Sequence, residues 1–224
     1  NYEIAVDLTK ANFDFYAGGG FLKPDKTYDK KEAPNIFPIF EEAGYTVARG
    51  YSDYKAKSKD AGKMILIQEE GKDPSCLPYA IDRKSDDLTL AQITESAIDF
   101  LTKGKNKGFF LMVEGARIDK SAHSNDYSAV VREVLDFDKA VEAAFRFAEK
   151  DGNTLVIISA DHETGALALR DGNIKEGKMK AMFVSKGHTP IMVPLFAYGP
   201  QSKLFGGVQE NSDVSNKILQ LLAK

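Results

Sequence analysis

Two short segments of the sequence combine carboxylates with imidazoles, side chains that bind transition-metal ions. Asp119 and His123 lie four residues apart, and a helix would place them one turn apart on the same face. Asp161 and His162 are adjacent and follow the apolar run at residues 154–158, which is typical of a buried strand. Adjacent side chains that leave a strand point to opposite sides, so this pair can reach one ion only from a loop. Ligands collect at such strand ends in α/β sheets.

The third histidine, His188, lies in a segment bounded by Gly and Pro and is expected in a loop between two strands. Each segment alone has an ordinary explanation: a surface ion pair for the first, a helix N-cap for Asp161 and a solvated side chain for His188. However, all three histidines of the chain fall in these segments, and Glu114 ends a predicted strand before the first. Zn²⁺ accepts mixed His and carboxylate ligands in open sites, and pairs of such ions are typical of phosphoryl-transfer hydrolases.

The composition of the chain is that of an ordinary globular protein. It has 224 residues, of which 43% are hydrophobic and 28% are charged, enough for one good core or two small ones. The formal net charge of -3 gives no electrostatic reason to expect a nucleic-acid partner. The single cysteine, Cys76, excludes an intrachain disulfide and any multi-cysteine metal site. No apolar run reaches transmembrane length.

The apolar runs predict a layered α/β fold in a single domain over residues 1–224. Apolar residues at helical spacing predict helices over 34–44, 88–104, 125–152 and 212–224. Ser212 or Asp213 is the expected N-cap of the last helix. Short runs rich in β-branched and aromatic residues predict strands over 45–50, 63–68, 108–115, 153–161, 180–187 and 193–200. Because several of these runs are apolar at consecutive positions, we expect a largely parallel central sheet flanked by helices.

Three segments together resemble the C-terminal motifs of the alkaline phosphatase family. They are FFLMVEGARIDKSAH, DGNTLVIISADHETGAL and GHTPIMVPLFAYGP, and they occur in the order of the family's motifs. The likeness extends to LTLAQITESAIDFL and, more faintly, to DFYAGGGF, so it covers most of the chain. It implies hydrolysis of a small phosphate monoester through a phosphoseryl intermediate, at a site with two Zn²⁺ and one Mg²⁺. It also implies export to the periplasm or the cell surface and is compatible with a homodimer.

The resemblance assigns a role to each ligand residue. It implies that Asp119, His123 and His188 hold one Zn²⁺, while Asp161 and His162 hold the second. Neutral imidazole and ionised carboxylate are the forms that bind metal, which suits an alkaline working range.

Two further residues take roles from the resemblance. Glu114 would bind Mg²⁺, and Lys120 resembles the lysine that some bacterial members place near the substrate phosphate. The family's serine nucleophile lies in an Asp-Ser-Ala-like segment, and this sequence contains no such segment. Ser121 and Ser124 lie beside the ligand motif, but nothing in the sequence activates them as nucleophiles. We therefore expect the chain to match the C-terminal portion of an alkaline phosphatase and to lack phosphatase activity alone.

Two alternatives stay open. Other members of the wider metal-dependent superfamily hydrolyse phosphodiesters, phosphonates or sulfate esters, and the nucleophile segment would distinguish them from a phosphatase. The combination of VEGARID with GHTPIMVPLFAYGP favours alkaline phosphatase. The second alternative is a non-catalytic metal-binding module, which upstream sequence with a serine nucleophile would exclude.

Overall fold

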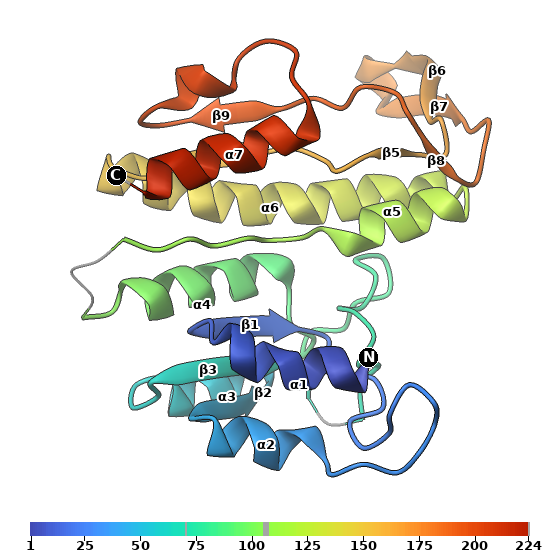
Figure 1. Ribbon diagram of the computed structural model, residues 1–224. Helices are drawn as coiled ribbons and strands as arrows, with labels where there is room; N and C mark the ends of the chain where they lie inside the picture. The colour runs from blue at the N-terminus through green and yellow to red at the C-terminus, as the bar shows by residue number, and fades with distance from the viewer. Residues whose placement is uncertain (70, 105–107, 224) are drawn as a thin grey trace. The chain divides into compact units, whose positions relative to one another are not determined.

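The structure, a computed structural model, describes residues 1–69, 71–104 and 108–223 (Figure 1). It has the expected α/β fold and forms two compact units. The first unit comprises Asn1–Arg117 and Arg132–Ala140, and the second comprises Ile118–Val131 and Val141–Lys224. The expectation of a single domain over residues 1–224 stays a prediction. Among the described residues, no helix is long and apolar enough to span a membrane.

A three-stranded parallel sheet forms the centre of the first unit. Its central strand reads KMILI, and the apolar side chains of this strand alternate between two hydrophobic cores. Ile65 and Ile67 face one core, while Met64 and Leu66 face the other. Burial on both faces explains why this strand is apolar at consecutive positions. The strands lie in the order β1-β3-β2 and are β1 (Phe15–Gly18), β2 (Tyr45–Arg49) and β3 (Lys63–Ile67).

Helices cover both faces of this sheet. Residues of α1 (Tyr2–Ala11) and α2 (Ile36–Glu42) fill one core, together with Tyr45 of β2. Residues of α3 (Gly50–Lys57) and α4 (Leu90–Thr102) fill the other core. The helices α2 and α4 confirm the predictions over 34–44 and 88–104. The helices α1 and α3 were not predicted; they are short and bury only two residues each.

The predicted strand over residues 108–115 is wrong. The segment forms no ladder with any strand in the described part of the chain. Its side chains alternate between exposed and half-buried, and Phe110 and Met112 are both exposed. An apolar run becomes a strand only where a neighbouring backbone takes up its hydrogen bonds, and the run itself does not encode that neighbour.

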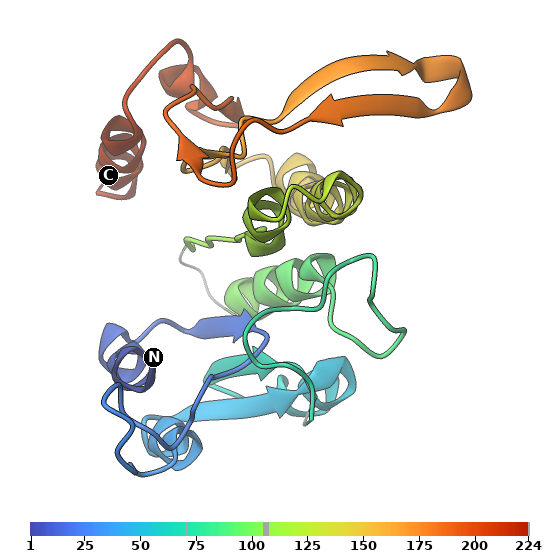
Figure 2. The same cartoon turned by 90° about the vertical axis from the view of Figure 1, so that its right-hand side faces the viewer.

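The strands of the second unit pair antiparallel, two by two. The predicted strands over 153–161, 180–187 and 193–200 are present here in shorter or shifted form. Asn173 pairs with Lys178 in a hairpin, and this pairing sets the register of the second of these strands, so the strand begins and ends earlier than predicted. Figure 2 shows the hairpin in orange. The pairs are β4 (Val156–Ile158) with β9 (Phe196–Tyr198), β5 (Glu163–Thr164) with β8 (His188–Thr189), and β6 (Ala168–Asn173) with β7 (Lys178–Met182).

The long helix α6 (Tyr127–Asp151) confirms the prediction over 125–152. It begins after the N-cap Asp126, whose side chain accepts a hydrogen bond from the backbone amide of Ala129. It ends at Gly152, which takes the left-handed conformation with a φ of 71°.

The last helix, α7 (Asn211–Leu222), confirms a helix within 212–224, of which residue 224 lies outside the described residues. Its N-cap is Glu210, so the expectation of Ser212 or Asp213 is wrong. Asp213 is the third helical residue, and its side chain accepts a hydrogen bond from the backbone amide of Glu210. Glu210 and Asp213 form a capping box, in which Glu210 is the N-cap and Asp213 bonds back to it from the first turn.

Candidate metal centre

The second unit brings Asp119 close to two histidines from different elements. Asp119 and His123 lie on α5 (Ala116–His123), where their spacing of four places them on one face, and His188 lies on β8. Asp119 Oδ1 is 3.3 Å from His123 Nε2 and 3.4 Å from His188 Nε2. The two Nε2 atoms are 3.1 Å apart. The expectation that His188 lies in a loop is wrong, because it forms a short ladder with β5.

These three distances fit the ligand shell of a zinc ion. Bonds of about 2.0–2.1 Å at tetrahedral angles place neighbouring ligand atoms about 3.3–3.4 Å apart. The three atoms therefore form one face of a tetrahedron of nearly the right size. A fourth position opposite this face would be left for a non-protein ligand, as in open zinc sites.

His162 joins the same cluster. Its ring stacks on that of His188, with centroids 3.6 Å apart and planes inclined by 23°. Asp119, His162 and His188 each offer one ligand atom, and these atoms lie within 4.8 Å of one another. His162 Nε2 is also 3.2 Å from Asp161 Oδ2. The structure thus brings the two predicted zinc-ligand sets together in one unit.

The bend that carries Asp161 and His162 follows β4, as expected for residues that leave a strand. The first residue of α7 holds this bend, because Asn211 Nδ2 donates a hydrogen bond of 2.8 Å to the carbonyl of Asp161. The Asp161 side chain is 84% exposed, whereas that of His162 is 29% exposed. Asp161 therefore faces solvent, and His162 lies against the cluster.

The β5–β8 ladder needs a glycine at residue 165. Gly165 has a φ of +87°, a region that favours glycine, and its amide donates to the carbonyl of Gly187. A Cβ atom there would lie 2.8 Å from the ring of Phe183 and 3.3 Å from the carbonyl of Ala122. The glycine therefore allows the ladder to approach the end of α5, which carries two of the predicted ligands.

Thr164 contacts two members of the cluster. Its hydroxyl donates a hydrogen bond of 2.6 Å to Asp119 Oδ1 and lies 3.3 Å from His162 Nδ1. Burial acts to raise the pKa of Asp119, but the Thr164 hydroxyl and the three neighbouring imidazoles outweigh it. The pKa of Asp119 is therefore below its usual value, and the carboxylate stays ionised over a wide pH range.

Thr164 was not among the residues predicted from the sequence to form the site. Thr164 and Asp119 are 45 residues apart, and nothing local in the sequence links them. One signal was present: Thr164 follows His162 by two positions at the start of a strand, and residues two apart in a strand share a face. The backbone carbonyl of Lys186 contacts His123 Nδ1. The sequence could not indicate this contact, because every residue carries a backbone carbonyl.

The remaining predicted site residues supply none of the ligand atoms described above. Lys120 is exposed, Ser121 is buried, and the hydroxyl of Ser124 donates to the carbonyl of Lys120. Glu114 belongs to the first unit, where it lines a cavity. The roles of Glu114 and Lys120 stay predictions.

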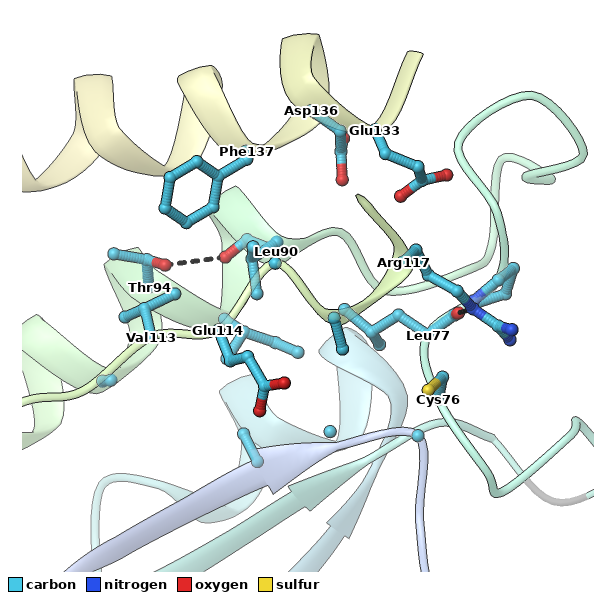
Figure 3. Close-up of a pocket in the computed structure, with 18 of the residues that line it drawn as sticks. Cys76, Leu77, Leu90, Thr94, Val113, Glu114, Arg117, Glu133, Asp136 and Phe137 are labelled. Carbon is cyan, nitrogen blue, oxygen red and sulfur yellow. Dashed lines mark hydrogen bonds between the residues drawn. The ribbon is translucent and has the colours of Figure 1, made fainter. Parts of the chain in front are cut away.

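That cavity in the first unit has a volume of about 400 Å³ (Figure 3). Glu133 and Asp136 of α6 line it together with Glu114 and Cys76. Two hydrogen bonds of 2.5 and 2.7 Å join Arg83 to Asp136. The Glu133 carboxylate accepts a hydrogen bond of 2.6 Å from a backbone amide. Burial raises the pKa of Glu133. Because the protein already engages both acids of α6, the cluster of the second unit is the better candidate for a metal centre.

Comparisons with known proteins show which proteins this chain is similar to. The family profile described as "Alkaline phosphatase" matches residues 31–182. Alkaline phosphatase 4 of Bacillus subtilis is 31% identical over 280 aligned residues, covering 95% of this chain and 58% of that protein. The alkaline phosphatase of the Antarctic bacterium TAB5 superposes with a TM-score of 0.84 at 35% identity, over 97% of this chain and 63% of that one.

A variant of the Antarctic enzyme, also with a TM-score of 0.84 and 35% identity, has a structure described with Mg bound in its M3 site. That comparison again covers 97% of this chain and 63% of the other. The chain thus spans about three fifths of the length of these relatives. The profile match over more than half of its residues and the shared fold agree, and the chain belongs to the alkaline phosphatase family.

Proposed function

We propose that this chain forms the zinc-binding part of an alkaline phosphatase that hydrolyses small phosphate monoesters. The observation that carries the proposal is the triangle of ligand atoms from Asp119, His123 and His188, with edges of 3.1, 3.3 and 3.4 Å. These edges match the spacing of neighbouring ligands around tetrahedral zinc. The same residues resemble the ligands of one zinc ion in the family.

The second zinc ion would be held by Asp161 and His162, beside the first set. The stacked rings of His162 and His188 support two neighbouring ions, because the two predicted sets touch there. Two protein ligands leave this second position incomplete, so we expect weaker binding than at the first. Glu114 would contribute to a Mg²⁺ site. The variant of the Antarctic relative described with bound Mg supports the presence of a magnesium ion in a protein of this family.

Bound zinc would supply Lewis acidity at a phosphate oxygen and lower the pKa of coordinated water. The chain's own residues would hold and orient the ions, with an ionised Asp119 and neutral imidazoles as ligands. Lys120 would contact the substrate phosphate. In the family the nucleophile is a serine, and we propose that it lies outside these 224 residues, so that the chain alone is inactive. The periplasm or cell surface is the proposed location.

A zinc titration tests the proposal. Isothermal calorimetry on the wild type at pH 8 should show one tight site, and His188→Ala should lower its affinity more than about 100-fold, since even outer-shell changes cost about 10–100-fold. Affinity should also fall as the pH is lowered, because protons compete with the metal ion for its ligands.

The matched control is Asp171→Asn, which changes an exposed carboxylate of the β6–β7 hairpin in the same unit. This variant should bind zinc like the wild type. Equal zinc affinity in the wild type and His188→Ala would contradict the assignment.

A further inference from the structure

We propose that the cavity of the first unit binds a β-strand from outside these 224 residues, which pairs with β1 on one side and with residues 108–115 on the other. The inference rests on the part of the proposed function that places further chain outside these residues. It depends neither on bound zinc nor on phosphatase activity.

Residues 108–115 have the sequence of a buried strand but not its surroundings. The run GFFLMVEG is apolar at consecutive positions, like the run KMILI of β3. The apolar side chains of β3 are at most 4% exposed, whereas Phe110 is 57% and Met112 is 74% exposed. Exposed and half-buried side chains alternate along the segment, which is the period of an extended backbone. The segment therefore has the shape of a strand and lacks the neighbours of one.

The backbone of this segment has no partner strand, and β1 has one on a single side. Within the described residues, 110–114 join no ladder and form no backbone hydrogen bond with another segment. The strand order β1-β3-β2 places β1 at an edge of its sheet. An unpaired strand edge presents a row of N–H and C=O groups that can pair with another strand. Two such edges in one unit are suited to bind an added strand.

The cavity of about 400 Å³ lies between these two edges. Phe15, Ala17 and Gly18 of β1 line it, and so do residues 111–115. Figure 3 shows the side chain of Glu114 pointing from its segment toward β1. A strand placed in this cavity would meet backbone groups on both sides.

A small polar ligand would find few free partners in the same cavity. The carboxylate of Asp136 is bound by Arg83, and that of Glu133 accepts a backbone amide. The unpaired groups that remain along both sides belong to the backbone, and a second extended backbone is the partner that pairs with such groups in series.

The lengths of the relatives indicate where this strand comes from. The chain matches about three fifths of their length, so about two fifths of each relative has no counterpart here. We assign the cavity to an extended segment of that remainder. The segment should carry bulky apolar side chains, because β1 offers only the small residues Ala17 and Gly18 beside it.

Hydrogen exchange measured by mass spectrometry tests the proposal on two proteins, this 224-residue chain and the complete product of its gene. The amides of residues 110–114 should exchange in the short chain at nearly the rate of an unstructured peptide. In the complete protein they should exchange at least about 1,000-fold more slowly, because the amides of core strands open only with much of the fold. The amides of β3, which already form two ladders, should be protected in both proteins.

A substitution on the exposed face of the segment gives a second measurement. Met112→Lys should leave the melting temperature of the short chain unchanged and lower that of the complete protein by several degrees, because the lysine would be buried there without a partner. The matched control is Met179→Lys, at another exposed methionine, on β7. This control should leave both melting temperatures unchanged.

A crystal structure of the complete protein should show one strand hydrogen-bonded both to β1 and to residues 108–115. Equal exchange of residues 110–114 in the two proteins would overturn the inference, and so would a gene that encodes no further chain. Protection in the short chain that rises with its concentration, together with a dimer in analytical ultracentrifugation, would assign the cavity to a second copy instead. A complete protein with protected amides but no phosphatase activity would refute the proposed function and leave the added strand supported.

Discussion

Alkaline pH should destabilise the first unit through one buried phenol. Tyr45 is 3% exposed, and its hydroxyl donates a hydrogen bond of 2.8 Å to the carbonyl of Phe13. Burial, with a smaller effect of the neighbouring Tyr16, raises the pKa of Tyr45 from 10.0 to about 12. Desolvation disfavours the phenolate, so the folded protein holds this proton more tightly than the unfolded chain does.

The sign and size of the effect follow from this difference. Below pH 10 both states keep the proton, and Tyr45 adds no pH dependence. As the pH rises from about 10 to 12 the unfolded chain loses its proton first, so the free energy of unfolding falls. Two pH units at about 1.36 kcal/mol each give a loss of about 2.7 kcal/mol once the pH exceeds the folded-state pKa.

Urea denaturation followed by circular dichroism at pH 9, 10, 11 and 12 measures this loss. Tyr45→Phe should be less stable by about 1 kcal/mol at pH 9, because it lacks the bond to Phe13. Its stability should then fall less steeply, so that the variant overtakes the wild type by pH 12. Tyr28→Phe, at a phenol that is 88% exposed, should follow the wild type. Parallel curves for the wild type and Tyr45→Phe would refute the reasoning.

Two further predictions concern the second unit and the chain as a whole. Gly165→Ala should destabilise the β5–β8 ladder by more than about 1 kcal/mol and weaken zinc binding, because a Cβ there meets Phe183 at a positive φ. The control Gly177→Ala, at a positive φ with open space around it, should leave zinc affinity unchanged. Equal zinc affinities in the two variants would contradict this view. The 224-residue chain with Zn²⁺ and Mg²⁺ should hydrolyse p-nitrophenyl phosphate several orders of magnitude more slowly than an alkaline phosphatase that contains the serine nucleophile. A comparable rate that Ser121→Ala or Ser124→Ala abolishes would show that the nucleophile lies within the chain.

Local patterns in the sequence predicted much of the fold and, within the site, the contact between Asp119 and His123. The run at β3 predicted a strand buried on both faces, because consecutive apolar residues fill a core on each side. The spacing of Asp119 and His123 predicted that a helix would bring them together, and α5 does so at 3.3 Å. In both cases the information lies within a few residues of the chain.

The local sequence pattern does not predict which distant segments of the chain pair with one another. The segment 108–115 looks like a buried strand, but its pattern does not say whether another backbone lies beside it. The place of His188 on a ladder depends on residue 164, and the link between Thr164 and Asp119 joins segments 45 residues apart. Only the folded second unit shows that the two predicted ligand sets share one hydroxyl.

The β5–β8 ladder is short, so the site depends for its stability on side-chain interactions more than on backbone pairing. It contains only two residue pairs, and one member of each pair, Thr164 and Thr189, donates its hydroxyl to a carboxylate. A ladder of this length has little stability of its own, since even a longer hairpin is marginal in water. An ion held between α5 and β8 would bind the folded unit and not the unfolded chain, and mass action would then stabilise the fold. The site and the local fold around it would therefore form together.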